Sequence, residues 1–220
     1  MNTKNAQEVE SGNAVQRLVH FSDAVVAIAI TLLTLELRLP EDLASGEVPG
    51  RLLDTLPELF AFLVSFWVIA SYWITHHRIL GRIGAHDSAL LNINFVFLMW
   101  VVLVPFSTSM VMEYGDSRLV WDVYVSHLLL TSLTLSWLWR YASEDESLLE
   151  PNADFDMPRR CGSVQVWSIR AMLLLSIFIS FFSVDYAQWF LLFVLPLPTL
   201  VGPLRRQLAG RIRRHGQGGV

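Results

Sequence analysis

The sequence predicts an all-α membrane protein with six transmembrane helices per subunit, and three observations support this fold class. Hydrophobic residues make up 53% of the 220 residues, and charged residues only 16%, whereas soluble domains usually carry about 25% charged residues. The apolar residues are gathered in blocks of roughly 20, the length that an α-helix needs to cross the ~30 Å hydrocarbon core of a bilayer. Short polar segments separate these blocks, as in multi-pass membrane proteins.

The first helix is expected over residues 18–37, after a polar tail of residues 1–16. This tail lacks a short apolar core with a cleavage site, and the apolar run that follows is too long for a signal-peptide core. We therefore interpret the run as a retained transmembrane helix. The loop of residues 38–56 that follows is rich in Pro and Gly, which favour turns.

The second helix is expected to start at Pro57, because Pro suits the first turn of a helix. Pro196 and Pro198 predict a kink in the last helix. The transmembrane domain is assigned to residues 17–204, followed by a basic tail of residues 205–220. The expected helices cover approximately residues 18–37, 57–78, 87–110, 119–141, 163–184 and 187–204.

The distribution of Lys and Arg predicts the orientation in the membrane. Six spans place both termini on one side. The two tails and the connectors after the second and fourth helices, with Arg170 included, hold all of the Lys and Arg except Arg38, Arg51 and Arg118. Because cytoplasmic segments carry the excess of Lys and Arg, both termini are predicted to face the cytoplasm, with the protein in the cell (plasma) membrane.

Asp23 is a carboxylate inside the first apolar run, and such a group by default indicates a functional site. At ~100° per residue, a stripe on one side of this helix includes Ile28, while Asp23 lies ~140° away from Ile28. The stripe and the carboxylate are therefore expected to have different roles. The stripe consists of Ala24, Ile28, Thr31, Leu32 and Leu35.

Several other functions are disfavoured. The sequence lacks a glycine-rich phosphate loop, a CxxC pair and a GxSxG turn, so we expect no enzyme and no cofactor. Adjacent His76 and His77 point to different helix faces, which disfavours a metal site. A net charge of −4 predicts no nucleic-acid partner. The sequence also lacks a TVGYG-type stretch, so no carbonyl-lined selectivity filter is expected.

Proline, serine and threonine residues at 105–109, PFSTS, leave two interpretations open. The hydroxyls could line an ion pathway. Alternatively, they could satisfy backbone carbonyls that a kink at Pro105 leaves without donors, and we favour this second interpretation.

The run RLVHFSD at residues 17–23, followed by AVVAIAITLLTLEL, resembles the transmembrane-protein-175 family of FSD-motif potassium channels, and the chain is similar to its single-repeat bacterial members. Residues 73–80 (WITHHRIL) and 90–114 extend the resemblance. It implies a homotetramer in which the first helix of each subunit lines a central pore. The resemblance carries the structural and gating motif onto Arg17, Phe21, Ser22 and Asp23, together with His77 or, alternatively, His76.

The family's ring of bulky apolar residues after the motif corresponds to Ile28, with Thr31 and Leu35 at the next levels of the pore, beside Leu32. Ala27 stands where the family has Ser or Thr. The resemblance implies a potassium-permeable channel that conducts monovalent cations passively through a hydrophobic constriction, with K⁺ held transiently near Thr31. Its partners would be the lipid bilayer, potassium and other monovalent cations. A secondary transporter, proton-coupled or otherwise, with Asp23 as its titrating group is the alternative.

Overall fold

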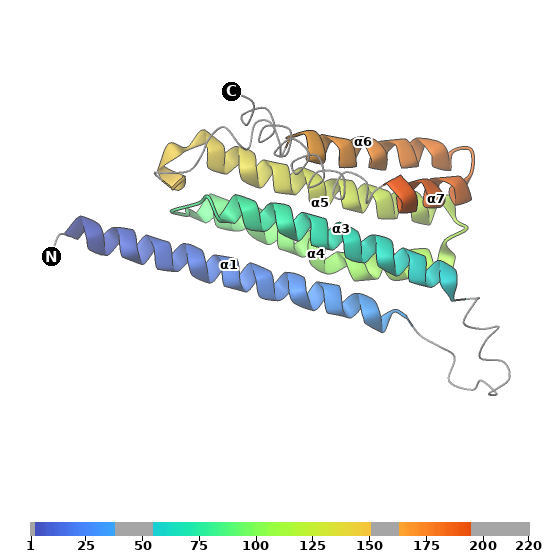
Figure 1. Cartoon of the computed structure of the whole chain (residues 1–220), viewed down its shortest axis with the longest axis horizontal. Coiled ribbons are helices and arrows are strands. Elements are labelled where there is room, and N and C mark those ends of the chain that lie inside the picture. Colours follow the sequence, from blue (N-terminus) through green and yellow to red (C-terminus); the bar gives the residue numbers. More distant parts are fainter. Residues whose placement is uncertain (1–2, 38–54, 151–162, 195–220) are drawn as a thin grey trace, which may run out of the picture.

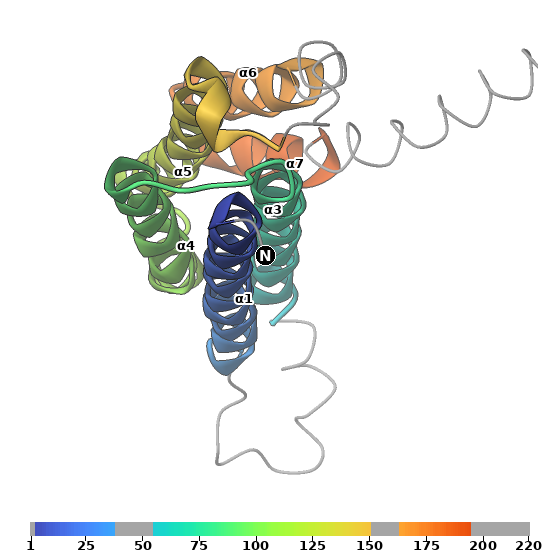
Figure 2. The ribbon, with the colours of Figure 1, turned by 90° about the vertical axis from the view of Figure 1, so that its left-hand side faces the viewer.

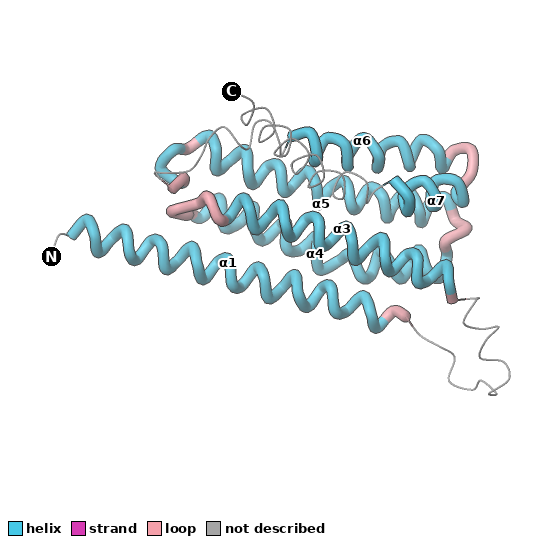
Figure 3. Tube along the Cα trace, in the orientation of Figure 1, coloured by secondary structure: helices cyan, strands magenta, loops and turns pink. Residues whose placement is uncertain are grey.

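The computed structural model describes residues 3–37, 55–150 and 163–194, and within these residues the chain is helical apart from short turns (Figures 1 and 3). In the described segments, β-type pairing consists of an isolated antiparallel bridge between Ile83 and Leu149. The elements are α1 (Thr3–Leu35), α3 (Leu56–Leu80), α4 (Ser88–Tyr114), α5 (Arg118–Glu144), the 3₁₀ turn η1 (Glu146–Leu148), α6 (Ser163–Ser180) and α7 (Val184–Val194).

The long helices run side by side, with α1 at one edge of the subunit and α6 at the other (Figure 1). The end-on view shows α1 against α3 and α4, while α5 separates this group from α6 (Figure 2). The contacts between elements follow the same order, since α1 packs on α3 and α4, α4 on α5, and α5 on α6. One side of α1 is therefore left uncovered by its own subunit.

Four of the described helical segments are long and apolar enough to cross a membrane: Gly12–Leu35, Glu58–Leu80, Ser88–Tyr114 and Arg118–Glu144. The apolar helices Trp167–Ser180 and Val184–Val194 are shorter. The helices of residues 57–78, 87–110 and 119–141 that the sequence predicts thus correspond to α3, α4 and α5. The predicted last helix of residues 187–204 overlaps α7, and its second half lies outside the described residues, as does most of the 38–56 loop.

Helix α1 begins at Thr3 and not near residue 18, so residues 3–16, predicted as a polar tail, are helical, and the candidate membrane span starts at Gly12. The sequence before residue 17 holds no Pro, and Gly12 is its one strong helix-disfavouring residue. Once the apolar part of the helix has formed, each further residue adds one hydrogen bond without a new nucleation step. The helix therefore continues past the apolar run.

Pro105 lies inside α4, and the helix continues beyond it to Tyr114. The hydroxyls of Ser107 and Thr108 donate hydrogen bonds of 3.0 and 2.8 Å to the carbonyl of Val104. The Thr108 hydroxyl also lies 2.7 Å from the hydroxyl oxygen of Ser65 on α3, and both side chains are buried. These hydroxyls thus point into the helix bundle, and the carbonyl that they bond is not that of Val101, which Pro105 leaves without its N–H donor.

The turn between α3 and α4 is tied to the end of α5. The backbone N–H of Gly84 donates to the carbonyl of Leu148 at 2.9 Å. Asp87 caps α4 by accepting from the N–H of Leu90 at 2.8 Å, and it also accepts from the Tyr141 hydroxyl of α5 at 2.5 Å. The hydrogen bonds from Tyr141 and Leu90 lower the pKa of the Asp87 carboxyl. These contacts fix the start of α4, which carries the buried part of the site described next.

Candidate ion pathway and polar cluster on α1

Helix α1 has one buried and one exposed face. The buried face consists of small or apolar residues and one serine, and it packs against α3 and α4. Because the buried positions recur every three or four residues, they form one stripe along the helix. These residues are Val15, Leu18, Ser22, Val26, Ala29 and Leu33.

The stripe that the sequence predicts for the pore lies on the exposed face of α1. Ile28 is 59% exposed, Leu35 60% and Leu32 37%, and Ala24 and Thr31 are also exposed. The Thr31 hydroxyl donates to the carbonyl of Ile28 at 2.8 Å, so it is bonded to its own helix. Between residues 24 and 35, the face that the subunit leaves uncovered therefore consists of apolar side chains and threonines, and the carboxylate of Asp23 is not on it.

Asp23 lies against α3. Its Oδ1 atom accepts a hydrogen bond of 2.8 Å from Nε1 of Trp73 and lies 3.9 Å from Nδ1 of His77. The rings of Trp73 and His77, one turn apart on α3, lie side by side with centroids 5.4 Å apart. The Asp23 side chain is 33% exposed and that of His77 54%. The carboxylate therefore joins two helices of one subunit at a partly accessible position.

Ser22 belongs to a second, fully buried polar group. Asn94 of α4 donates from Nδ2 to the Ser22 hydroxyl at 3.0 Å, and its Oδ1 lies 2.7 Å from Nε2 of His76 on α3. All three side chains have an exposed fraction of 0%. Because Oδ1 can only accept, His76 must donate from Nε2. The Ser22–Asn94–His76 cluster thus connects α1, α3 and α4 in the interior of the subunit.

The second nitrogen of His76, Nδ1, is buried and has no hydrogen-bond partner in the described part of the chain. The His76 ring stacks on Phe97 of α4, with centroids 4.6 Å apart and an interplanar angle of 13°. Since Nε2 carries the proton, a neutral ring presents Nδ1 as an acceptor without a donor. Asn94 is therefore the polar contact on which the orientation of His76 depends.

The remaining residues of the motif lie on the exposed side. Phe21 is 49% exposed and makes an edge-to-face contact with Phe95 of α4 at 5.9 Å. Arg17 is exposed, and among the described residues it forms no ion pair with Asp23. The structure thus brings Ser22 and Asp23 into contacts with α3 and α4, and it places His76 and His77 in different contacts.

Trp73 and Asn94 also belong to this site, although the sequence did not predict them as site residues. Asn94 carries a signal that could have revealed it, because a carboxamide within an apolar membrane helix needs a partner on a neighbouring helix. Trp73 precedes His77 by four residues, so the two side chains share one helix face. No group of three or more His, Cys, Asp or Glu residues able to hold a metal ion occurs in the described segments.

Known proteins are similar to this chain over the region that contains the polar cluster and the exposed face of α1. Residues 17–105 match the family described as "Endosomal/lysosomal potassium channel TMEM175". A potassium channel of Chamaesiphon minutus is 36% identical over 143 residues, which cover 63% of this chain and 70% of that protein. A potassium channel of Streptomyces collinus is 35% identical over 150 residues, which cover 64% of this chain and 71% of that protein.

Among solved structures, the chain is similar to the crystal structure of a lysosomal potassium-selective channel TMEM175 homolog from Chamaesiphon minutus. The two share 30% sequence identity and superpose with a TM-score of 0.72. The superposition covers 86% of this chain and 97% of the other. The residues matched by the family, 17–105, include Ser22, His76 and Asn94 and the exposed face of α1 around Ile28.

Proposed function

The chain belongs to the TMEM175 family, and on this premise we propose that it is a potassium-permeable channel of the plasma membrane. It conducts potassium, and other monovalent cations less well, down their gradients and without a cofactor. The observation that carries the proposal is the uncovered face of α1 between residues 24 and 35, which has Ile28 near its middle and no charged side chain. A face of this kind on a peripheral helix suits a narrow pathway built from several copies of α1.

In the proposed assembly, four copies of α1 surround a central pathway. The side chains of Ile28, Leu32 and Leu35 face the axis, and the Ile28 ring forms the constriction. Rings of branched apolar side chains can gate a channel by excluding water. Thr31 lies between these levels, where the pathway would hold K⁺ transiently. The polar groups of α1 then have a structural role, since Ser22 and Asp23 join it to α3 and α4.

A recording from the purified protein in a planar bilayer tests the function. With potassium on one side and sodium on the other, we expect a reversal potential shifted toward the potassium equilibrium potential, together with unitary current steps. A current that reverses at zero under these conditions would contradict potassium preference. The absence of current from correctly assembled protein would contradict the channel itself.

The alternative of a secondary transporter is not favoured, and the same preparation distinguishes it. A carrier with Asp23 as its titrating group would couple potassium movement to a pH gradient in a fixed ratio. For the channel, we expect potassium flux into vesicles to follow the potassium gradient when the pH gradient is abolished. Flux that requires a pH gradient, and that Asp23→Asn eliminates, would support the carrier.

We predict that both termini face the cytoplasm and that the connector between α1 and α3 faces outward, because of the distribution of Lys and Arg. Cysteines introduced singly at Ser45 and Ser143, in a Cys161→Ser background, report the topology. A membrane-impermeant thiol reagent applied to intact cells should label Ser45→Cys and not Ser143→Cys. The opposite labelling would reverse the orientation, and labelling of both after permeabilisation is the control for reactivity.

We predict that Asp23→Asn weakens the packing of α1 on α3 and leaves cation selectivity unchanged. The substitution removes the charge from the hydrogen bond with Trp73 and the attraction to His77. Hydrogen bonds to charged groups contribute about 1.5–3 kcal/mol, so we expect a loss of about 1–2 kcal/mol at this partly exposed site. Thermal unfolding and size-exclusion chromatography of the purified protein measure this loss.

Trp73→Phe is the matched variant, because it removes the donor and retains the ring. It should lower stability to a similar extent, and the two substitutions together should cost less than the sum of their separate effects. An Asp23→Asn protein of unchanged stability and altered selectivity would instead place the carboxylate in the ion pathway.

A further inference from the structure

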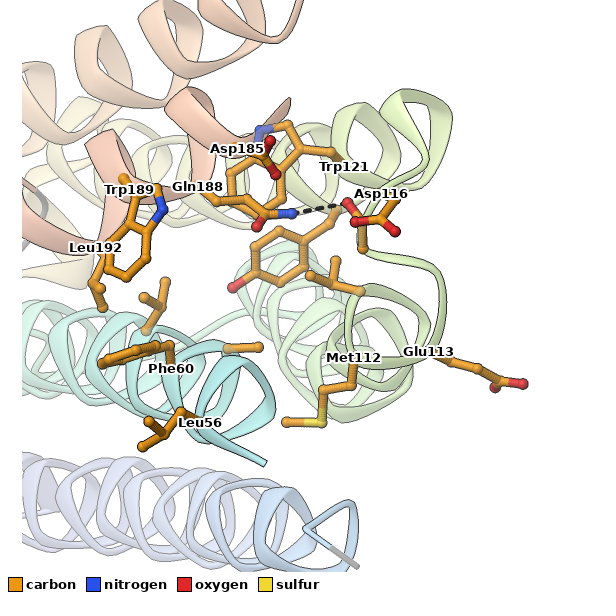
Figure 4. A pocket seen from close by; sticks show the side chains of 15 residues that line it. Leu56, Phe60, Met112, Glu113, Asp116, Trp121, Asp185, Gln188, Trp189 and Leu192 are labelled. Atoms are coloured by element: carbon orange, nitrogen blue, oxygen red, sulfur yellow. Dashed lines mark hydrogen bonds between the residues drawn. The ribbon is translucent and has the colours of Figure 1, made fainter. Parts of the chain in front are cut away.

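A cavity of about 590 Å³ opens at the end of the bundle where α3 begins and α4 ends. Its volume lies within the ~300–1,000 Å³ typical of small-molecule sites. Neither α1 nor the polar cluster that α1 forms with α3 and α4 contributes a residue to its lining. Figure 4 shows Phe60 of α3 and Trp189 of α7 on one side of it and Trp121 of α5 on another.

The rim of the cavity is acidic. Asp116, from the turn between α4 and α5, and Asp185, at the start of α7, both line it. The hydrogen bond from Gln188, one turn after Asp185, to the carbonyl of Gly115, which precedes Asp116, joins the two segments that carry them. Glu113 also belongs to the lining, but its side chain points away from the cavity and accepts a hydrogen bond of 2.7 Å from the Tyr114 hydroxyl. No Lys or Arg occurs among the described residues that line the cavity.

Hydrogen bonds between the helices that surround the cavity fix its walls. Gln188 donates to the carbonyl of Gly115 at 2.8 Å, which fixes α7 against the turn between α4 and α5. A side chain at Gly115 would bring its Cβ within 2.6 Å of the carbonyl oxygen of Val111, so only glycine fits there without a shift. The polar atoms of Trp121 and Tyr124 are bonded to Ser176 and Ser65, at 3.2 and 2.9 Å. The two aromatic rings therefore line the cavity with their apolar surfaces.

From these features we propose that the cavity binds an organic ammonium cation with an apolar body. Aromatic ring faces attract such cations, and the attraction increases when the site excludes water. Asp116 and Asp185 supply the opposite charge, and the apolar residues of α3 and α7 accommodate the hydrocarbon part of the ligand. The same chemistry is presented by a free amine in solution and by the choline headgroup of a lipid. This site is independent of the proposed ion pathway.

Binding is tested with benzyltrimethylammonium on the purified full-length protein in nanodiscs of digalactosyldiacylglycerol, a lipid with neither net charge nor an ammonium group. Isothermal titration calorimetry should show saturable binding. The double variant Asp116→Asn/Asp185→Asn and the single variant Trp189→Leu should each weaken it about five-fold, the upper range of a cation–π contact or an ion pair at an exposed site. Thermal unfolding of each variant verifies that the fold is retained.

Glu113→Gln is the matched control, since it removes a negative charge from the same rim and its side chain points away from the cavity. It should leave the affinity within about two-fold of the wild type. Choline should compete with benzyltrimethylammonium, and 3,3-dimethylbutan-1-ol, its uncharged isostere, should compete at least about five-fold more weakly. Equal effects of Glu113→Gln and the double variant, or equal competition by the isostere, would overturn the proposal.

Nanodiscs of phosphatidylcholine, which are also uncharged overall, distinguish the two sources of the ligand. If the lipid headgroup occupies the cavity, benzyltrimethylammonium should bind more weakly in phosphatidylcholine than in digalactosyldiacylglycerol. This difference should disappear in the Asp116→Asn/Asp185→Asn variant. Equal affinities in both lipids assign the site to a free amine. No saturable binding in either lipid would overturn the proposal, whatever the channel activity of the same sample.

Discussion

Ile28→Asn should increase the potassium current through the assembled protein by on the order of tenfold. In the proposed assembly, four isoleucine side chains form a ring that water wets reluctantly, so a cation that crosses it loses part of its hydration without replacement. Asparagine has a similar size and adds an amide that hydrates the ring. Each ~1.4 kcal/mol removed from the barrier raises the crossing rate about tenfold. Single-channel recording at symmetrical potassium measures the increase.

The same substitution should reduce the preference for potassium over sodium if the apolar constriction contributes to the discrimination between these ions. Bi-ionic reversal potentials measure that preference. Ile30→Asn is the matched control, because Ile30 lies two residues further along α1, off the stripe and partly buried in the packing of the subunit. It should lower stability and leave unitary conductance unchanged. An Ile28→Asn protein with unchanged currents and lowered stability, in the same oligomeric state, would mean that Ile28 is a packing residue.

Asn94→Leu should lower the free energy of unfolding by about 2–6 kcal/mol. Asn94 is buried and bonds both the Ser22 hydroxyl and Nε2 of His76. Leucine has a similar volume and bonds neither group, and a buried polar group without a partner costs about 1–3 kcal/mol each. His76 would then have two buried nitrogens without partners, since its Nδ1 has none already. Denaturant unfolding of the purified protein in detergent measures the loss.

Asn92→Leu is the control for this prediction, because Asn92 is exposed on the same helix two residues earlier. Its effect should lie within about 0.5 kcal/mol, as for most surface substitutions. Adding Ser22→Ala to Asn94→Leu should restore part of the lost stability, because it removes the unsatisfied hydroxyl and leaves only the ring nitrogens of His76 without partners. If Asn94→Leu is as stable as Asn92→Leu, the Ser22–Asn94–His76 cluster does not hold α1 to the subunit.

The helices were predictable because hydrophobic length and periodicity are local properties of the sequence. The helical-wheel projection of the first helix predicts that Asp23 and Ile28 lie on different faces. In the structure, Asp23 lies against α3 and Ile28 is exposed. The extent of α1 was not predictable from hydropathy, because its polar first turns extend an apolar helix that already exists. The partners of Asp23 and Ser22 were not predictable either, since a helix wheel gives the direction of a side chain and not the residue it meets. Trp73 and Asn94 reach these positions through the packing of α3 and α4.

The position of α1 at the edge of the subunit has a consequence for its biosynthesis. Ser22 and Asn94 are 72 residues apart in the chain, and α1 buries its inner face against helices that are made after it. At ~5–20 residues per second, Asn94 is synthesised about 4–14 s after Ser22. During that interval α1 lies in the membrane with its serine unpartnered, while Trp73, the partner of Asp23, is synthesised before Asn94. Insertion and packing of α1 are therefore separate events, and a chain truncated before α3 leaves α1 inserted without either of the helices on which it packs.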